Sequence, residues 1–181
     1  VERFVSEMDK LSVGPALDPT TQIGPVVSDT QLKSNLSYVE IARNEGCEVV
    51  SGQHLAERNT GYFQRPGAFL NANNKMRSSR EEIFGPVASI IKVDDFEEAV
   101  ATANDTEFGL SSAICTRSLY YAREFKRLSE AGMAMVNLPT AGVDYHVPFG
   151  GRKNSSYGSR EQGRAAIDFY TTTKTTYSFA G

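Results

Sequence analysis

The sequence predicts an α/β fold, in which crossover helices connect the strands of a mainly parallel sheet and a further strand lies at the C-terminus. Short apolar segments of strand length alternate with amphipathic segments of helical period. Capping residues and glycines delimit most of the helical segments. The 181 residues suffice for a continuous apolar core. We expect one domain over residues 1–170 and a separate strand segment over residues 171–181.

Two helices are expected in the first quarter of the chain. The first begins at Val1 with no capping residue before it, which suggests that the sequence was taken from a longer protein. The second begins at Ser28, which forms a capping-box pattern with Gln31, and it ends at Gly46. Their predicted apolar faces are Val1, Phe4, Val5, Met8 and Leu11, and Leu32, Leu36, Val39 and Ala42, respectively.

Three further helices are expected in the rest of the chain. Asp95 opens one with Glu98 as its capping partner, Ser118 opens the next, which stops at Gly132, and a short helix lies near Arg160 to Phe169. The residues expected to face inward on the first two are Phe96, Ala99, Val100 and Ala103, and Leu119, Ala122, Phe125 and Leu128.

Apolar segments between these helices predict the strands of the sheet. Because strands that alternate with helices are joined by crossovers, a mainly parallel arrangement is expected. Two short extended pieces are also expected between Gly61 and Leu70. The predicted strands are Cys47–Ser51, Val87–Val93, Ser112–Thr116 and Met133–Val136.

The C-terminal segment has a different composition. Thr171 to Tyr177 is rich in threonine with tyrosine at its end, which is typical of a β-strand. A strand at the end of a chain needs a partner sheet, on another element or on another subunit.

The composition excludes several classes of function. A net charge of −3, with 23% charged and 40% hydrophobic residues, leaves neither a basic surface for nucleic acid nor an apolar span for a membrane. No secretory signal is visible, so we expect a cytoplasmic protein in which Cys47 and Cys115 are reduced thiols. His54 and His146 show no metal-ligand spacing, and no metal is predicted.

The segment Glu81 to Val87, EEIFGPV, is the most specific in the chain. A pair of carboxylates precedes a Gly85-Pro86 turn that leads into a buried strand, and binding sites of α/β folds gather at such strand ends. The Glu82 carboxylate could accept hydrogen bonds from vicinal hydroxyls, as in ribose. The alternative interpretation is a solvated carboxylate pair before a turn.

Four ordered segments resemble the C-terminal half of the NAD(P)-dependent aldehyde dehydrogenase superfamily. Besides EEIFGPV they are LDPTTQIGPVVS at residues 17–28, NDTEFGLSSAI at residues 104–114 and VPFGGRKNSSYGSREQG at residues 147–163. Together with their spacing they cover nearly the whole chain. The resemblance implies the catalytic domain of that family, truncated on its N-terminal side.

The resemblance also implies roles for particular residues. Glu82 matches the glutamate that binds the nicotinamide ribose hydroxyls, and Phe84 matches the aromatic residue that contacts the same end of the cofactor, NAD or NADP. Phe149 matches an aromatic residue of the substrate pocket, although it could instead be a core aromatic before a glycine turn. Arg160 and Glu161 match a structural element. The candidate substrate-contacting residues of the preceding loop are Thr140, Ala141, Gly142 and Val143.

In the family mechanism, a cysteine thiolate attacks the aldehyde, hydride passes to the nicotinamide and a glutamate-activated water hydrolyses the thioester. The resemblance implies that the nucleophile and the general base lie upstream of Val1. Cys47 and Cys115 are interpreted as small core residues. We therefore expect no catalytic residue in this chain and no activity of the chain alone.

The stretch NLPTAGVDYHVPFGGRK at residues 137–153 resembles the subgroup that oxidises 2-oxoglutarate semialdehyde (2,5-dioxopentanoate). Arg152 and Lys153 are expected to lie in water. Asn154, where the family usually has glycine, is expected in a left-handed conformation.

Two alternative functions remain at this point. The chain could act as an assembly module, because its terminal strand would extend the sheet of a neighbouring subunit in a homodimer or homotetramer. It could also come from a related reductase of acyl phosphates or acyl thioesters. The aldehyde is the only other small-molecule partner expected besides the nicotinamide cofactor.

Overall fold

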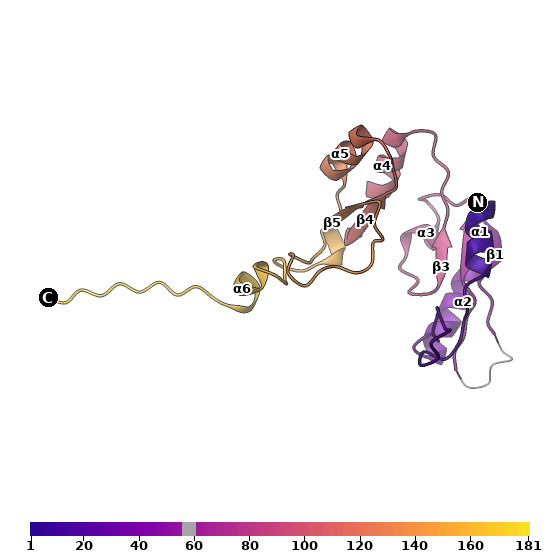
Figure 1. The fold of residues 1–181 in the computed structure, drawn as a ribbon, viewed down its shortest axis with the longest axis horizontal. Coiled ribbons are helices and arrows are strands. Elements are labelled where there is room, and N and C mark those ends of the chain that lie inside the picture. The colour runs from indigo at the N-terminus through magenta and orange to yellow at the C-terminus, as the bar shows by residue number, and fades with distance from the viewer. Residues whose placement is uncertain (56–60) are drawn as a thin grey trace. The chain divides into compact units, whose positions relative to one another are not determined.

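The computed structural model describes residues 1–55 and 61–181 (Figure 1). The chain divides into two compact units, residues Val1–Val93 and residues Asp94–Gly181. This division lies inside the domain predicted over residues 1–170, and the boundary at residue 170 stays a prediction. The two units are called the first and the second unit below, and each is described by itself.

The first unit contains a three-stranded sheet in the order β1-β2-β3 (Figure 1). Strands β1 and β2 are antiparallel, with Val49 opposite Phe69, whereas β2 and β3 are parallel, with Ala68 opposite Ala88. Its elements are α1 (Glu2–Asp9), α2 (Asp29–Asn44), β1 (Glu48–Ser51), β2 (Gly67–Leu70), α3 (Arg77–Arg80) and β3 (Val87–Ser89).

Helix α2 begins and ends where its local sequence predicts. The Ser28 hydroxyl accepts a hydrogen bond from the Gln31 backbone N–H at 3.1 Å, and Gly46 follows the helix with φ +93°. The helix buries Val39 and Ala42 against Phe69 of β2, with Cys47 and Ala72 in the same cluster. Leu36, expected on this face, is only half-buried.

The second unit contains a two-stranded parallel sheet, with Ser112 of β4 opposite Ala134 of β5. The Asp95 carboxylate caps α4 by accepting from the Glu98 backbone N–H at 2.8 Å, as predicted. Its elements are α4 (Phe96–Asn104), β4 (Ser111–Ile114), α5 (Leu119–Leu128), β5 (Met133–Val136), the 3₁₀ helix η1 (Lys153–Ser155) and α6 (Ala165–Tyr170).

The inward faces of α4 and α5 differ in part from the prediction. Val100 and Phe125 are buried, but Ala103 is exposed and Leu119 is 88% exposed. Leu119 is the first residue of its helix, so it lies beyond the stretch of α5 that packs on the sheet. Leu128, at the other end of α5, is also largely exposed, at 37%. The helical period therefore predicted the central contacts and failed at the ends.

The predicted α/β fold with mainly parallel pairing is confirmed in part, because two of the three pairs between described strands are parallel, but the strands form two sheets rather than one. The structure has two small sheets, and the first contains an antiparallel pair. A parallel pair needs a crossover connection, usually a helix, and the described part of the link between β1 and β2 contains none. His54 and Gln64 instead continue the antiparallel pairing as an isolated bridge. Strand β3 is also shorter than predicted, because it ends at Ser89 rather than Val93.

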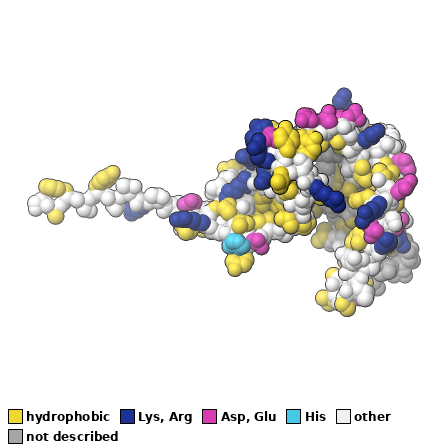
Figure 2. Space-filling view, turned by 45° about the horizontal axis from the view of Figure 1, so that its top comes forward, with side chains coloured by type: hydrophobic (Ala, Val, Ile, Leu, Met, Phe, Trp, Pro, Cys, Tyr) yellow, Lys and Arg dark blue, Asp and Glu magenta, His cyan; other side chains and the backbone are white. Residues whose placement is uncertain are grey.

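The C-terminal segment is exposed throughout residues 171–181, and the structure describes no strand there. Apolar side chains lie uncovered along this segment in Figure 2, among them Tyr177 at 96% and Phe179 at 94% exposure. A strand formed with a partner sheet stays a prediction. Among the described residues, no helix combines the length and the apolar character that crossing a bilayer requires.

Candidate functional site

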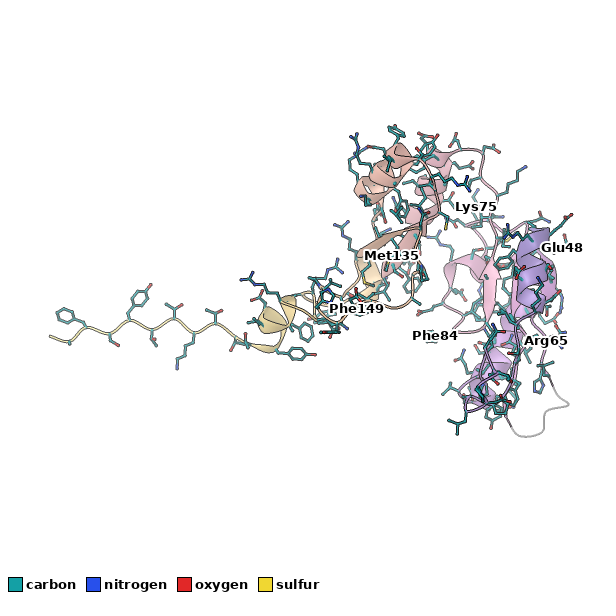
Figure 3. All side chains as sticks on the ribbon, viewed as in Figure 1. Glu48, Arg65, Lys75, Phe84, Met135 and Phe149 are labelled. Atoms are coloured by element: carbon teal, nitrogen blue, oxygen red, sulfur yellow. The ribbon has the colours of Figure 1, made fainter. Side chains whose placement is uncertain are left out.

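Glu82 and Phe84 lie on the loop between α3 and β3 of the first unit (Figure 3). Phe84 has a left-handed backbone, with φ +57°, and its side chain is 77% exposed. This conformation is costly for a bulky aromatic residue, and such strain is concentrated at functional sites. The exposed ring of Phe84 is accessible for a stacking contact with a ligand.

Buried side chains beneath the loop fix this conformation. The Gln31 side-chain amide donates to the Ile83 carbonyl at 2.9 Å, and the Asn35 amide lies 2.8 Å from that of Gln31. Asn35 is fully buried and packs directly against Gly85. A Cβ atom at residue 85 would lie 2.6 Å from the Asn35 Cγ, so only glycine allows this approach.

A pocket of about 490 Å³ opens beside Phe84. Gln31 and the turn Gly85-Pro86 form one part of its lining, and residues 23–27 form the rest. Glu82, two residues before Phe84 in the sequence, does not line this pocket.

The two neighbouring carboxylates have different surroundings. Arg77 donates to both oxygens of Glu81, at 2.8 and 2.9 Å, and the Tyr38 hydroxyl donates to it at 2.5 Å. The Arg77 hydrogen bonds, with that from Tyr38, lower the pKa of Glu81 from 4.5 to about 2. Glu82 is exposed, and among the described residues its carboxylate has no hydrogen-bond or ion-pair partner. Only Glu82 is therefore free to accept hydrogen bonds from a ligand.

The second predicted group lies in the second unit, on the loop that follows β5. Thr140, Ala141 and Gly142 are exposed, and Val143 is half-buried. Phe149 is half-buried as well and pairs with Glu161 through two backbone hydrogen bonds, at 2.7 and 3.0 Å (Figure 3).

Asn137 directs the chain from β5 into this loop, a role that the sequence analysis missed. Its φ is +57°, and its side-chain oxygen accepts from the Thr116 backbone N–H at 2.8 Å while its nitrogen donates to the Thr116 carbonyl at 2.9 Å. The amide thus substitutes for one residue of strand pairing. Asparagine directly after a strand was the available signal, because it tolerates left-handed backbone better than other non-glycine residues.

Arg160 and Glu161 were predicted to be structural. Glu161 acts through its backbone, in the pairing with Phe149, and the Arg160 guanidinium donates to the Gly132 carbonyl at 3.4 Å. Arg160 thus contacts the residue directly before β5. Both residues contact the ends of the segment that carries the candidate pocket residues.

The expectation for Asn154 is wrong, and that for Lys153 holds in part, because the residue is exposed but its side chain is engaged by the protein. The Lys153 side chain is only 24% exposed; it forms an ion pair with Glu130 at 2.6 Å and donates to the Thr106 carbonyl at 3.1 Å. The left-handed residue is Lys153, the first residue of η1, with φ +51°, and Asn154 is not among the described residues with a positive φ. Arg152 is exposed, as predicted.

The two cysteines are free thiols with different surroundings. Cys47 is buried as predicted, and burial raises the pKa of its thiol, which disfavours the nucleophilic thiolate. Cys115 is exposed, so its interpretation as a core residue is wrong. The alternation of β4 explains this, because Ala113 and Cys115 lie on the same outward face. The described residues also include no group of three or more side chains that could hold a metal ion.

Comparison with known proteins identifies the family. The sequence profile of the Aldehyde dehydrogenase family matches residues 1–176. An alpha-ketoglutarate semialdehyde dehydrogenase of Haloferax volcanii is 44% identical over 181 residues, covering 98% of this chain and 37% of the relative. A betaine aldehyde dehydrogenase of Mesorhizobium japonicum is 37% identical, covering 100% of this chain and 37% of the relative.

A solved structure agrees with these sequence matches. It is that of a putative methylmalonate-semialdehyde dehydrogenase from Sinorhizobium meliloti complexed with NAD, which has a TM-score of 0.89 and 31% identity. The match covers 96% of this chain and 36% of that chain, so the sequence described here spans little more than a third of such proteins. With a family profile matching nearly its full length, this chain belongs to the aldehyde dehydrogenase family.

Proposed function

We propose that this chain forms the part of an NAD(P)-dependent aldehyde dehydrogenase that holds the nicotinamide end of the cofactor and shapes the substrate pocket. The bound cofactor supplies the hydride acceptor. In this proposal, the Glu82 carboxylate accepts hydrogen bonds from the ribose hydroxyls, and the Phe84 ring packs against the same end of the cofactor. The exposed, left-handed Phe84 carries the proposal.

The difference between the adjacent carboxylates supports a ligand role for Glu82. Glu81 is occupied by Arg77 and Tyr38, whereas Glu82 is exposed two residues before the strained aromatic. A carboxylate has acceptor oxygens for both hydroxyls of a ribose. Gln at this position would keep one acceptor and lose the charge that strengthens these hydrogen bonds.

The test is the cofactor KM of a full-length polypeptide that contains this chain. For Glu82→Gln we expect the KM for NAD or NADP to rise about tenfold, because a hydrogen bond to a charged group is lost. The matched control is Glu81→Gln, which removes the neighbouring carboxylate from a surface ion pair and should change that KM less than about twofold. Equal effects of the two variants would contradict the role of Glu82.

The proposed substrate is 2-oxoglutarate semialdehyde, with Phe149, Thr140, Ala141, Gly142 and Val143 at its pocket. The similarity of residues 137–153 to that subgroup and the 44% identity to the Haloferax volcanii enzyme support this choice. The small, uncharged side chains at residues 140–143 leave room for an aliphatic chain. Lys153 is already paired with Glu130, so a different group has to recognise the substrate carboxylate.

Substrate charge separates this proposal from its nearest competitor. 2-Oxoglutarate semialdehyde is an anion at neutral pH, whereas betaine aldehyde, the substrate in the name of the Mesorhizobium japonicum relative, is a cation. We expect the full-length enzyme to give the higher kcat/KM with the anionic aldehyde. A preference for betaine aldehyde would overturn the substrate assignment and leave the cofactor assignment standing.

We further propose that this chain alone has no activity. Burial raises the pKa of the Cys47 thiol and so disfavours its ionisation. Cys115, directly after β4, is exposed. Measurable aldehyde-dependent reduction of NAD or NADP by the purified chain would refute this. Replacing Cys115 by serine would then identify or exclude it as the source of that activity.

The C-terminal segment supports a second candidate role, in assembly. Tyr177 and Phe179 are almost fully exposed on a segment of β-prone residues, which suits pairing with a sheet of another subunit. Deleting residues 171–181 should lower the number of subunits in the oligomer, which light scattering gives as the measured mass divided by the mass of one polypeptide. An unchanged number of subunits would rule out this role.

A further inference from the structure

Two side-chain amides lie at the centre of the first unit. Asn35 of α2 is 0% exposed and Gln64 is 1% exposed, and with Phe69 they are the largest fully buried side chains. Burying an amide is unfavourable unless its hydrogen bonds are replaced, and apolar residues of similar size would fill the same space. Their presence in the core therefore calls for an explanation other than packing.

The amides form a continuous series of hydrogen-bond contacts that ends at residues 81–86, the proposed cofactor loop. Gln64 donates to the Gly52 carbonyl at 2.9 Å, and its amide lies 3.0 Å from that of Asn35. Asn35 in turn lies 2.8 Å from Gln31, which donates to the Ile83 carbonyl at 2.9 Å. This series of contacts thus connects the turn after β1 with the peptide unit that precedes Phe84.

These contacts act on both sides of the strained residue. The φ angle of Phe84 is the torsion about its N–Cα bond, and the Ile83 carbonyl carbon is one of the four atoms that define it. A hydrogen bond that holds the Ile83 carbonyl therefore restrains this angle. On the other side, the Asn35 amide packs against Gly85. With both neighbours fixed, Phe84 cannot relax to an ordinary backbone conformation without displacing a buried side chain.

We infer that Asn35 and Gln64 are positioning residues, which hold Phe84 in its cofactor-binding conformation through Gln31 and Gly85. Both are fully buried and have no access to a ligand, so they act only through the loop. This inference rests on the proposed function. If only the held conformation binds the cofactor, the apparent Kd rises in proportion as that conformation becomes less populated.

The test replaces the amides by apolar residues of similar volume in a full-length polypeptide that contains this chain. The double variant Asn35→Leu with Gln64→Leu removes both members, so neither buried amide is left facing a leucine, while the Gly52 carbonyl and the Gln31 amide each lose one partner. We expect the Kd for NAD to rise about tenfold, because that factor corresponds to the free energy stored in one strained residue. The aldehyde KM should stay within about twofold of the wild-type value, since no pocket contact is lost.

A second measurement needs no cofactor at all. In the cofactor-free protein, hydrogen exchange of the backbone N–H groups within residues 84–87 (those of Phe84, Gly85 and Val87, since Pro86 has none) should become faster in the double variant, because the loop loses its restraint. The matched control is Met8→Ala, which removes a buried side chain from a different cluster of the same unit. It should lower Tm without changing either the Kd or the exchange of the loop.

The outcomes separate the inference from the proposed function. Unchanged loop exchange or an unchanged Kd in the double variant, or a Met8→Ala variant with the same changes, would overturn the positioning role. If Glu82→Gln has no effect on the cofactor while exchange at residues 84–87 still rises, the proposed function fails and the restraint of the loop stands. If the double variant does not fold, Gln64→Met, which keeps the side-chain length and removes the amide, carries the same expectations.

Discussion

The two loops that carry the candidate site residues are fixed in different ways. Residues 81–86 of the first unit are held in the middle, where the half-buried Gln31 amide contacts Ile83 and the buried Asn35 amide contacts Gly85, on either side of Phe84. Residues 137–149 of the second unit are held at their ends, by the Asn137 clamp on Thr116 and by the pairing of Phe149 with Glu161. Between these anchors, residues 140–142 are exposed.

This difference matches the proposed ligands. A cofactor is the same in every turnover and for every substrate, so a loop fixed in one conformation binds it without an ordering cost. A substrate loop anchored only at its ends can change the residues in between without disturbing the strands that support it. We therefore expect substitutions that disturb the backbone to lower the free energy of unfolding most in residues 81–86. In residues 137–149 we expect the largest losses from substitutions at the two end anchors.

The largest effect is expected for Gly85→Ala. Its Cβ would lie 2.6 Å from the buried Asn35 amide, so we expect the free energy of unfolding to fall by about 3 kcal/mol. The matched variant in the other loop is Gly142→Ala, where φ is +84° but a Cβ would meet nothing within 4 Å; backbone strain alone should cost about 1 kcal/mol. Urea unfolding measures the free energy of unfolding of both variants. Equal losses would contradict the different fixation of the two loops.

The next largest effect is expected for Asn137→Ala. This change removes both hydrogen bonds to Thr116 and leaves alanine in left-handed backbone, which should cost about 2 kcal/mol. Asn137→Gly keeps the backbone freedom and loses only the amide, so we expect about half of that loss. In a full-length enzyme the aldehyde KM should rise for both variants while the cofactor KM stays constant. A rise in the cofactor KM instead would contradict the assignment of this loop to the substrate.

The sequence predicted those features that depend on neighbouring residues. Ser28 and Asp95 cap their helices as expected, because a hydroxyl or carboxylate three residues before an N–H needs no other part of the chain. The strand pairing in the first unit was not predicted, because the period of an apolar segment does not specify which strand lies beside it. Lys153 was placed in water for the same reason, since its partner Glu130 is distant in sequence.

The assignment of Glu82 and Phe84 to the candidate site stays a prediction, and the geometry of their loop was not predicted. The motif identified Glu82 and Phe84, but nothing in it signals a positive φ at an aromatic residue, because local preference opposes it. The buried amides Asn35 and Gln64 were likewise invisible, since polar residues are normally expected on the surface. In both cases tertiary contacts override the local preference, and both lie at the proposed cofactor loop.

A smaller effect is expected from a pair of substitutions at Phe84. Because the side chain is 77% exposed, removing it costs little burial, and the two replacements differ mainly in how well they tolerate φ +57°. Phe84→Gly should therefore be more stable than Phe84→Ala by about 1 kcal/mol. Both variants should bind the cofactor more weakly than the wild type, although the glycine variant is expected to be more stable than the alanine variant. Equal urea midpoints would mean that this backbone is not strained.

The smallest effect concerns Glu81, whose surface ion pair with Arg77 lies at the start of the cofactor loop. Its pKa is about 2 in the folded chain, below the ordinary 4.5, because Arg77 and then Tyr38 donate to the carboxylate. A carboxyl group with a lowered folded-state pKa stabilises the fold above its unfolded-state pKa, and this contribution disappears as the pH falls from about 4.5 to about 2. Thermal unfolding over that range should show a flatter decline of Tm with falling pH for Glu81→Gln than for the wild type. Tyr38→Phe removes one of the two donors and should give an intermediate slope, and three identical slopes would show that the charge of Glu81 does not stabilise the fold.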